Sequence, residues 1–413
     1  MLAKSNLRSF APSPVRISLA LLLTVLLVFP DGLAASDTRC PASSGWQTSG
    51  APLTNPIETF GAAVSGTTSG DVMYVIGGEN WNSGTPVFQT QVLHKLVGGV
   101  ASGTPGTWFH NDLWKDPATN PLEVVGYSRA LCGVVNNGYL YTVGGVIHDS
   151  KTDQTYGSST NQVWFAPINP TNGNLGAWQI TTALPITTGL QLHGAVVLNN
   201  YLYVIGGSTD PVGDNNVSKN NWPTKHVHFT HINSDGTLGK WDFNIVTQTS
   251  VNLPDITSPG VGFYKTCPVA YNGSIYVSGG ENAGGALSQV VFATPSTTDG
   301  TFSAWNPATG LNINGTATTD AAQAVVYNNG IILIAGDQTG HGNDWPCVFQ
   351  GDVTGGGSIT WNINGTNSIP QLPIVVSRNA GATSGSLIFS LGGLHTVNNV
   401  PQDQSVIYYR SVP

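Results

Sequence analysis

The stretch Asn199–Gly207 reads NNYLYVIGG, and it recurs in varied form along this 413-residue chain. Each of the six copies is an apolar run that ends in two small residues, and only the fifth, Ala335-Gly336, lacks a glycine pair. The glycine pairs are Gly77-Gly78, Gly144-Gly145, Gly206-Gly207, Gly279-Gly280 and Gly392-Gly393. A repeat of this period predicts six copies of one supersecondary unit, which bury their apolar faces against one another.

A series of tryptophans runs in phase with these pairs: Trp46, Trp108, Trp178, Trp241, Trp305 and Trp361. After Trp361 the chain has 52 more residues, and 11 residues separate a processed start near Ala35 from Trp46, which together make one repeat of 63. The last unit is therefore expected to lack only its tryptophan-bearing strand, and the Trp46 segment is expected to supply it. Closing the array into a ring in this way protects the strand edges.

Each unit is predicted to contain four strands. In the copy around residues 191–241, these are Leu192–Leu198, Tyr201–Ile205, Lys225–Ile232 and the segment around Trp241. Asparagine and glycine between the first two strands accept the positive φ that tight hairpin turns require. The expected fold is all-β: a six-bladed β-propeller of four-stranded blades, with the last blade closed by the N-terminal strand.

This pattern resembles the kelch repeat. The matching residues are the later tryptophan and the endings in which a tyrosine precedes the glycine pair: Tyr74–Gly78, Tyr141–Gly145, Tyr203–Gly207 and Tyr276–Gly280. The resemblance covers about residues 40–413 and implies a divergent secreted branch of the kelch and galactose-oxidase-like superfamily. The fifth copy departs from the pattern, with Ile332 in the tyrosine position.

Residues 1–35 are predicted to be a signal peptide. Lys4, Arg8 and Arg16 precede the apolar run Ile17–Phe29, which is too short to span a bilayer comfortably. Residues 36–413 are then the propeller domain. We expect the mature protein to be secreted, periplasmic or at the cell surface, without membrane insertion.

Charged residues make up only 9% of the chain. Without the signal peptide the chain has 11 basic and 21 acidic residues, which gives a net charge of −10. Such an acidic surface argues against nucleic acid and anionic lipid as partners. The expected partner is an extracellular glycan or protein, and the expected state is a monomer.

The four cysteines allow one disulfide. Cys132 and Cys267 each lie 12 residues before a glycine pair, in units two apart, and this places them beyond bonding reach. Cys40 and Cys347 could bond only if the N-terminal arm folds back, and free buried thiols are the alternative. No close cysteine pair indicates a metal site, and no cofactor is expected.

Candidate ligand-binding residues follow from the resemblance, because in kelch-like rings two kinds of loop surround the mouth of the channel. One kind precedes the first strand and the other follows the glycine pair. The candidates in the first kind are Arg129, Gln191, Tyr264, Lys265, Asp320 and Arg378, and those in the second are Glu79, Glu281, Asp337 and His341. Binding residues concentrate in loops on rigid scaffolds. The alternative is that these side chains only pair with one another.

A zinc site is a further possibility at His226 and His228, which alternate onto one strand face. Two imidazoles need a third ligand from elsewhere. The position of His228 is filled by Trp164 in the preceding unit and Val291 in the next, so a packing role is favoured and no metal is expected.

Two functions remain open at this stage. Loops rich in tryptophan, asparagine and threonine, together with the absence of a Gly-x-Ser-x-Gly elbow, favour a non-catalytic recognition module. The alternative is a carbohydrate-active enzyme, such as a sugar epimerase or mutarotase, that uses Arg129, Arg378, Glu79 and Glu281. A copper-radical oxidase, known in the superfamily, is less favoured because Tyr264 and Cys267 have an odd spacing on one strand.

Overall fold

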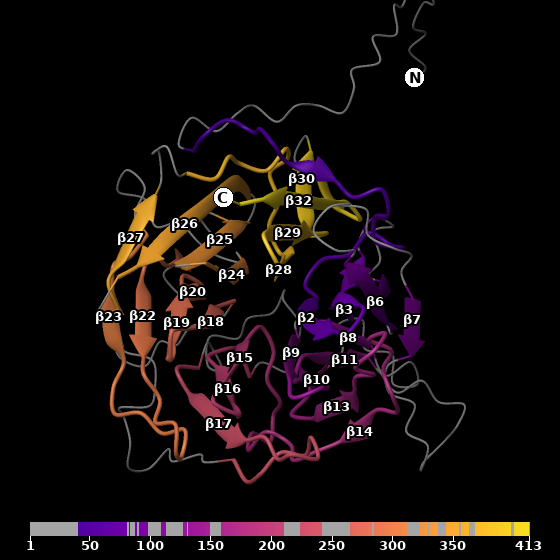
Figure 1. The fold of residues 1–413 in the computed structure, drawn as a ribbon, viewed down its shortest axis with the longest axis vertical. Coiled ribbons are helices and arrows are strands. Elements are labelled where there is room, and N and C mark those ends of the chain that lie inside the picture. Colours follow the sequence, from indigo (N-terminus) through magenta and orange to yellow (C-terminus); the bar gives the residue numbers. More distant parts are fainter. Residues whose placement is uncertain are drawn as a thin grey trace, which may run out of the picture. The chain divides into compact units, whose positions relative to one another are not determined.

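The structure is a computed structural model, described here for residues 40–80, 82, 87–88, 91–97, 109–112, 127–129, 131–148, 158–209, 224–241, 265–282, 285–311, 323–328, 330–337, 344–354, 357–362, 368–397 and 400–412. The predicted signal peptide lies outside the described residues. All the elements found in the described part are β-strands, and they form a β-propeller (Figure 1). The prediction of an all-β propeller is confirmed.

Five antiparallel sheets of four strands and one of three strands carry the repeated hairpins of the propeller, and they are numbered here in chain order of their first strands. Sheet 1 contains β2 (Gly61–Thr67), β3 (Gly70–Ile76), β6 (Gln91–Val97) and β7 (Phe109–Asp112). Sheet 2 contains β9 (Cys132–Asn136), β10 (Tyr139–Val143), β13 (Val163–Pro167) and β14 (Gln179–Ile180). Sheet 3 contains β15 (Gly194–Leu198), β16 (Tyr201–Ile205) and β17 (Val227–His231).

The other three sheets each have four strands. Sheet 4 contains β18 (Cys267–Tyr271), β19 (Ser274–Ser278), β22 (Val290–Ala293) and β23 (Asn306–Ala308). Sheet 5 contains β24 (Gln323–Tyr327), β25 (Gly330–Asp337), β26 (Asp344–Val353) and β27 (Ile359–Asn362). Sheet 6 contains β28 (Ala380–Ser384), β29 (Leu387–Leu391), β32 (Ile407–Ser411) and β1 (Gln47–Thr48). Five of the six sheets are therefore complete four-stranded blades.

The first strands of the sheets follow one another around a common centre (Figure 1). In order, β2, β9, β15, β18, β24 and β28 each contact the next, and β28 contacts β2 again. The apolar cores lie between consecutive sheets, and each of the six buried clusters draws its residues from two neighbours. Second strands such as β16 are buried along their whole length, because neighbouring sheets cover both of their faces.

Buried tyrosines connect consecutive sheets through their hydroxyl groups. The hydroxyl of Tyr74 in sheet 1 donates to the carbonyl of Gly173 at 2.7 Å, in the turn before β14 of sheet 2. Tyr141 donates to Gly236 at 2.8 Å, and Tyr203 donates to Gly300 at 2.7 Å. These three tyrosines thus bond sheet 1 to sheet 2, sheet 2 to sheet 3 and sheet 3 to sheet 4.

The glycine pairs leave the second strand in the left-handed region, with φ of +65° at Gly206 and +98° at Gly207. A Cβ on Gly207 would lie 2.7 Å from Cβ of His193 and 2.8 Å from the carbonyl oxygen of Gln191. The fifth copy takes a different path. There β25 continues through Ala335 to Asp337, with a register shift between Ile334 and Gly336. The presence of Ala335 therefore does not indicate that alanine is tolerated at position 206.

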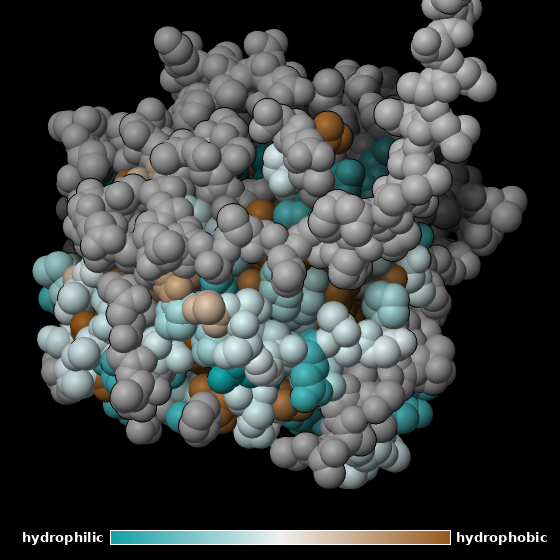
Figure 2. Space-filling view, turned by 90° about the horizontal axis from the view of Figure 1, so that it is seen from above, coloured by the Kyte–Doolittle hydropathy of each residue, from teal (hydrophilic) through white to brown (hydrophobic). Residues whose placement is uncertain are grey.

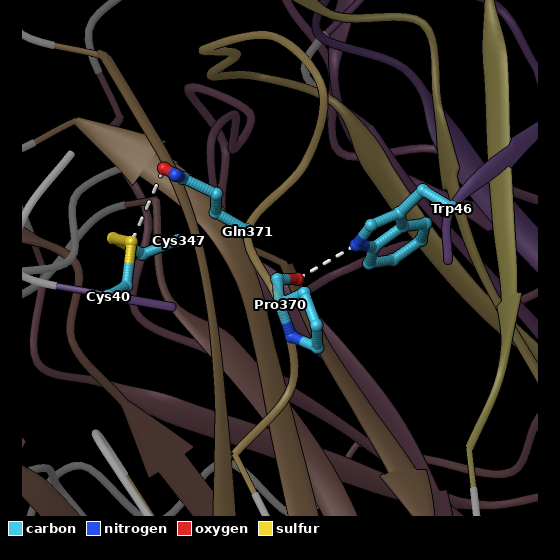
Figure 3. The surroundings of a disulfide bond; sticks show 5 residues. All are labelled: Cys40, Trp46, Cys347, Pro370 and Gln371. Carbon is cyan, nitrogen blue, oxygen red and sulfur yellow. Dashed lines mark hydrogen bonds between the residues drawn. A yellow bond between two sulfur atoms is a disulfide. The ribbon is translucent and has the colours of Figure 1, made fainter. Parts of the chain in front are cut away.

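The N-terminal arm closes the last sheet. Gln47 and Thr48 of β1 pair with Tyr409 and Tyr408 of β32, as expected from the position of Trp46. The indole nitrogen of Trp46 donates to the carbonyl of Pro370 at 2.8 Å (Figure 3). The arm thus contacts both the outer strand of sheet 6 and the segment that joins sheets 5 and 6.

A disulfide fixes the start of this arm to sheet 5. Cys40 is bonded to Cys347 on β26, across 307 residues of sequence, so the arm does fold back (Figure 3). Oε1 of Gln371 lies 3.6 Å from Sγ of Cys40, and the backbone nitrogen of Gln371 donates to the carbonyl of Pro41 at 3.0 Å. Cys132 and Cys267 are free thiols, in agreement with their predicted separation.

Gly206→Val is expected to lower the free energy of unfolding by about 2 kcal/mol or more, because a β-branched residue is strained at positive φ. Gly206→Ala is expected to cost about 1 kcal/mol for the same reason. Gly66→Ala serves as the control, since a Cβ there meets nothing closer than Oδ1 of Asp71 at 3.6 Å. Denaturant unfolding measures all three. A neutral Gly206→Val would contradict the assigned left-handed backbone.

Deletion of residues 36–50 is expected to remove β1 and the disulfide and to abolish soluble monomer or lower Tm strongly. The double variant Cys40→Ala, Cys347→Ala isolates the cross-link, whose loss should cost about 2–5 kcal/mol. Thermal unfolding of the three proteins, followed by circular dichroism, separates the two contributions. An unchanged melting curve for the deletion would show that the arm does not close the ring.

Candidate functional site

The two kinds of loop expected to surround the channel mouth do meet at one end of the sheets. In four sheets, a residue three positions before the first strand pairs with the residue that follows the glycine pair. These pairs are Glu58 with Glu79, Arg129 with Val146, Gln191 with Ser208 and Ser377 with Leu394. We call this end of the propeller, formed by both kinds of loop, the mouth.

One residue in each described mouth loop has a left-handed backbone. Thr59, Leu192, Lys265 and Arg378 lie two positions before the first strands, with φ between 52° and 56°. The amide of Thr59 donates to the carbonyl of Arg378 at 3.1 Å, and that of Lys265 donates to the carbonyl of Leu192 at 2.7 Å. Each of these bonds joins the mouth loops of neighbouring sheets, so the loops hold one another in place.

Arg378 forms an ion pair with Glu58 across sheets 6 and 1. Its Nη1 lies 3.2 Å from Oε2 and 3.4 Å from Oε1 of Glu58. The Glu58 side chain is 3% exposed and that of Arg378 28%. Backbone hydrogen bonds of 2.9 and 3.0 Å hold Glu58 against Glu79, which is also buried. Two of the predicted residues, Arg378 and Glu79, therefore lie around a glutamate that the sequence analysis missed.

The omission of Glu58 has a simple cause. In most sheets the candidate position lies 15 residues before the glycine pair, because each strand of the first hairpin has five residues. In sheet 1 both β2 and β3 have seven residues, so the same count falls on Ala62. Counting back from the start of the expected strand, rather than from the glycines, would have found Glu58.

A second ion pair lies within sheet 4. Nζ of Lys265 is 2.9 Å from Oε2 of Glu281, and both side chains are largely buried. Charge-assisted hydrogen bonds of this length are the stronger kind in proteins. Gln191 is also buried at the mouth. The pairing of charges foreseen as the alternative is therefore present for Lys265 with Glu281 and for Arg378 with Glu58.

The remaining predicted residues are only partly described or not described. Arg129 is the last residue of β8 (Tyr127–Arg129), and Asp337 is the last of β25; for both, only the backbone is described. Tyr264, Asp320 and His341 lie outside the described residues. Within the described ranges there is no group of three or more histidine, cysteine, aspartate or glutamate side chains arranged to hold a metal ion.

Short hairpins stand at the mouth after the glycine pairs. They are formed by β4 (Glu79–Asn80) with β5 (Val87–Phe88) and by β30 (Leu394–Val397) with β31 (Val400–Asp403). Asn82 bonds both of them together, because its carboxamide donates to the carbonyl of Asp403 at 3.1 Å and accepts from the amide of Asp403 at 2.7 Å. The hairpins of sheets 1 and 6 therefore form one continuous wall beside Arg378 and Glu58.

Of the two histidines considered for zinc, His228 is buried, with 1% of its surface exposed, and His226 is half-buried. His193, which was not part of the zinc hypothesis, is 4% exposed. Burial lowers the pKa of His228 to about 3, with the nearby His226 and His193 adding to the shift, and it lowers the pKa of His193 to about 4. The ring centroids of His226 and His228 are 6.1 Å apart. His228 and His193 fill the space between strands as neutral imidazoles, in line with the packing role that the sequence favours for His228.

Comparison with known proteins supports the fold and goes no further. No protein-family model matches the chain, and no curated protein matches it. Among solved structures, one described as the structure of YjhT has a TM-score of 0.55 at 14% identity, covering 86% of this chain and 99% of that one. At this identity the likeness shows a shared propeller fold. No helix in the described part of the chain is long and apolar enough to cross a membrane.

Acid is expected to destabilise the fold through His193 and His228. The pKa of an unfolded histidine is about 6.5, so this stability is fully present above pH 6.5 and is lost as pH falls towards the folded values near 4 and 3. For His193 the full loss is about 3 kcal/mol. His193→Leu with His228→Val should flatten the pH dependence of Tm between pH 6.5 and 4. Exposed His231→Gln is the control, and an equally steep profile in the double variant would refute the assignment.

Proposed function

We propose that this chain is a secreted, kelch-like six-bladed propeller that recognises a glycan or a protein at its mouth without catalysing a reaction. The proposal rests on one observation above all. Glu58, Glu79, Lys265, Glu281 and Arg378 gather at the mouth of a protein in which only 9% of residues are charged. Burying charge costs free energy even when it is paired, and apolar residues would close the ring at lower cost.

Sheet 3 is the blade on which the count of six depends. Ile232 pairs with Leu238 just as Ile168 pairs with Leu175 in sheet 2. The amide of Gly239 donates to the carbonyl of His231 as that of Gly176 donates to Pro167. In sheet 2 the fourth strand follows directly after Trp178, so the fourth strand of sheet 3 would begin after Trp241, outside the described residues. Sheet 3 is thus interpreted as a sixth blade, in line with the fourth strand predicted from the sequence around Trp241.

Paired charges suit recognition because they are held ready in one geometry. Arg378 is fixed by Glu58, and Lys265 by Glu281, so little side-chain freedom is lost when a ligand binds. Each pair presents N–H donors and carboxylate acceptors side by side, which is the combination that sugar hydroxyls and peptide groups require. Loops on a rigid ring keep these groups in register with one another.

Export is part of the proposal. The apolar run after Lys4, Arg8 and Arg16 has the length and flanks of a signal peptide. The Cys40–Cys347 bond fits an oxidising compartment, where disulfides persist. Among the residues that are coloured in Figure 2, pale shades of intermediate hydropathy prevail, as in a chain whose polarity comes from uncharged side chains. Such a surface suits a partner that is recognised through hydroxyl and amide groups.

A carbohydrate-active enzyme is the second candidate, and one contact favours it. Glu58 and Glu79 are both buried and are paired through their backbones, with Arg378 beside Glu58. Two carboxylates in neighbouring positions can act as acid and base on opposite sides of a sugar. Turnover of a bound sugar, followed by NMR of its anomeric protons, would favour this candidate over recognition alone.

The test of the proposal is a glycan and peptide array probed with the wild type and with Arg378→Lys. Arg378→Ala is unsuitable, because it would remove the ion pair that Arg378 forms with the buried Glu58 carboxylate and cost about 3–5 kcal/mol of stability. Lysine already occupies the equivalent left-handed position in sheet 4, at Lys265, so the backbone should accept it.

Arg378→Lys is expected to keep its Tm within a few degrees of the wild type and to weaken binding about tenfold, since lysine lacks the two-pronged contact of arginine. Arg129→Ala, in the loop before sheet 2, is expected to weaken binding by about 1.5–3 kcal/mol. Titration calorimetry with the best array ligand measures both. Wild-type protein that retains nothing on the array, or variants that bind as tightly as wild type, would reject the mouth as the site.

A further inference from the structure

The residues with a left-handed backbone form two groups, one at each end of the ring. Nine residues other than glycine have positive φ in the described part of the chain. Five are asparagines in the hairpin turns between first and second strands: Asn137, Asn199, Asn200, Asn272 and Asn328. The other four are the mouth residues Thr59, Leu192, Lys265 and Arg378. Asparagine tolerates this conformation, whereas the four mouth residues do not favour it.

The mouth residues therefore carry a cost that the hairpin residues avoid. A side chain in the left-handed region costs about 1–2 kcal/mol, and a β-branched residue such as Thr59 is a genuine outlier. Glycine would remove this strain, and the chain contains 51 glycines. Thr59 bears a second cost, because its hydroxyl is buried and has no hydrogen-bond partner in the described structure. Strain of this kind is concentrated where side chains serve a function.

Packing and ion pairing do not account for all four side chains. Lys265 and Arg378 have their glutamate partners. Thr59 and Leu192 are only half-buried, and neither belongs to any of the apolar clusters between sheets. Leu190, two residues earlier, is the leucine that packs in the core between sheets 2 and 3. The side chains of Thr59 and Leu192 are thus retained at a strained position without a visible contribution to stability.

The charge at the mouth indicates the chemical class of ligand. The described charged side chains at the mouth are three carboxylates, Glu58, Glu79 and Glu281, and two cations, Lys265 and Arg378. An excess of carboxylates disfavours an anionic ligand. An uncharged ligand with hydroxyl groups can use the carboxylates as acceptors and the cations as donors. An exposed part of Leu192 offers the apolar surface that the C–H face of a sugar ring requires.

We propose that Thr59, Leu192, Lys265 and Arg378 form the specificity face of the mouth, and that this face takes an uncharged saccharide. This inference rests on the proposed function and narrows it to one class of ligand. Side chains that interact with the sugar are retained at positions where glycine would adopt the left-handed backbone with less strain. Thr59 and Leu192 determine specificity by contact, whereas Lys265 and Arg378 act together with their glutamates.

The experiment compares Thr59→Gly and Leu192→Gly with a matched control, Asn272→Gly. All three replace a left-handed residue by glycine, but Asn272 lies in a hairpin turn between first and second strands, away from the mouth loops. Binding is measured on an array of neutral and carboxylated oligosaccharides, followed by calorimetric titration with the strongest neutral oligosaccharide. Tm is measured for every variant in parallel.

The expected result is that wild type binds neutral oligosaccharides, and that both mouth variants bind at least tenfold more weakly with an equal or higher Tm. The control should bind as wild type does. If wild type binds and both mouth variants bind equally well, the specificity face is refuted while the mouth can still be the site. Binding of carboxylated sugars alone refutes the ligand class. A wild type that binds no sugar or peptide rejects the proposed function itself.

Discussion

The packing of sheets 1 to 4 depends on a hydrogen bond that crosses from one sheet to the next, between a buried tyrosine hydroxyl and a glycine carbonyl. Tyr74, Tyr141 and Tyr203 make this bond to Gly173, Gly236 and Gly300. These glycines have φ between 72° and 86°, and a Cβ on any of them would lie within 2.7 Å of a neighbouring side chain. Only glycine both adopts this turn and leaves room for the side chains of the preceding sheet, which are Val72, Tyr139 and Tyr201.

Local hydrogen bonds prepare the glycine to accept this contact. Oδ1 of Asp235 accepts from the amide of Thr237 at 3.0 Å and from its hydroxyl at 2.6 Å, and Asp299 does the same with Thr301. These bonds to the ionised carboxylate lower the pKa of both aspartates. Side-chain turns of this type form without help from the rest of the fold. A short local motif thus positions the group on which the packing between sheets depends.

This division between local and distant causes explains how much could be predicted from the sequence. Strands, hairpin turns and the pairing of the Trp46 segment follow from patterns that recur six times, so single departures such as Ile332 did not obscure them. The ion pair of Arg378 with Glu58 and the disulfide do not recur from sheet to sheet. Glu58 meets Arg378 across 320 residues, and Cys40 meets Cys347 across 307. Nothing near either partner specifies the other, because each contact exists only once the ring has closed.

Closure of the ring also explains how the mouth can hold residues in a strained backbone conformation. Strained backbone persists only where the surrounding structure determines it more than once. At the mouth, Thr59 is bonded to Arg378 through its amide, and its neighbour Glu58 is bonded to the same arginine through its carboxylate. The hairpin end also has links across sheets: the amide of Thr68 donates to the carbonyl of Pro170 at 2.8 Å, the hydroxyl of Ser384 donates to Asp71 at 2.6 Å, and the carboxamide of Asn137 donates to that of Asn200 at 2.9 Å. There, however, the left-handed positions are filled by asparagine and glycine.

The two ends of the ring thus follow different physical rules. At the hairpin end the left-handed positions are filled by asparagine or glycine, which adopt this backbone conformation readily. At the mouth, left-handed backbone, buried charge and an unpaired hydroxyl are held by contacts between sheets 6 and 1, which the disulfide-bonded N-terminal arm joins to sheet 5. The protein tolerates this loss of stability because the six apolar cores between sheets stabilise the ring. A binding surface can require charged and strained residues that selection for stability alone would replace.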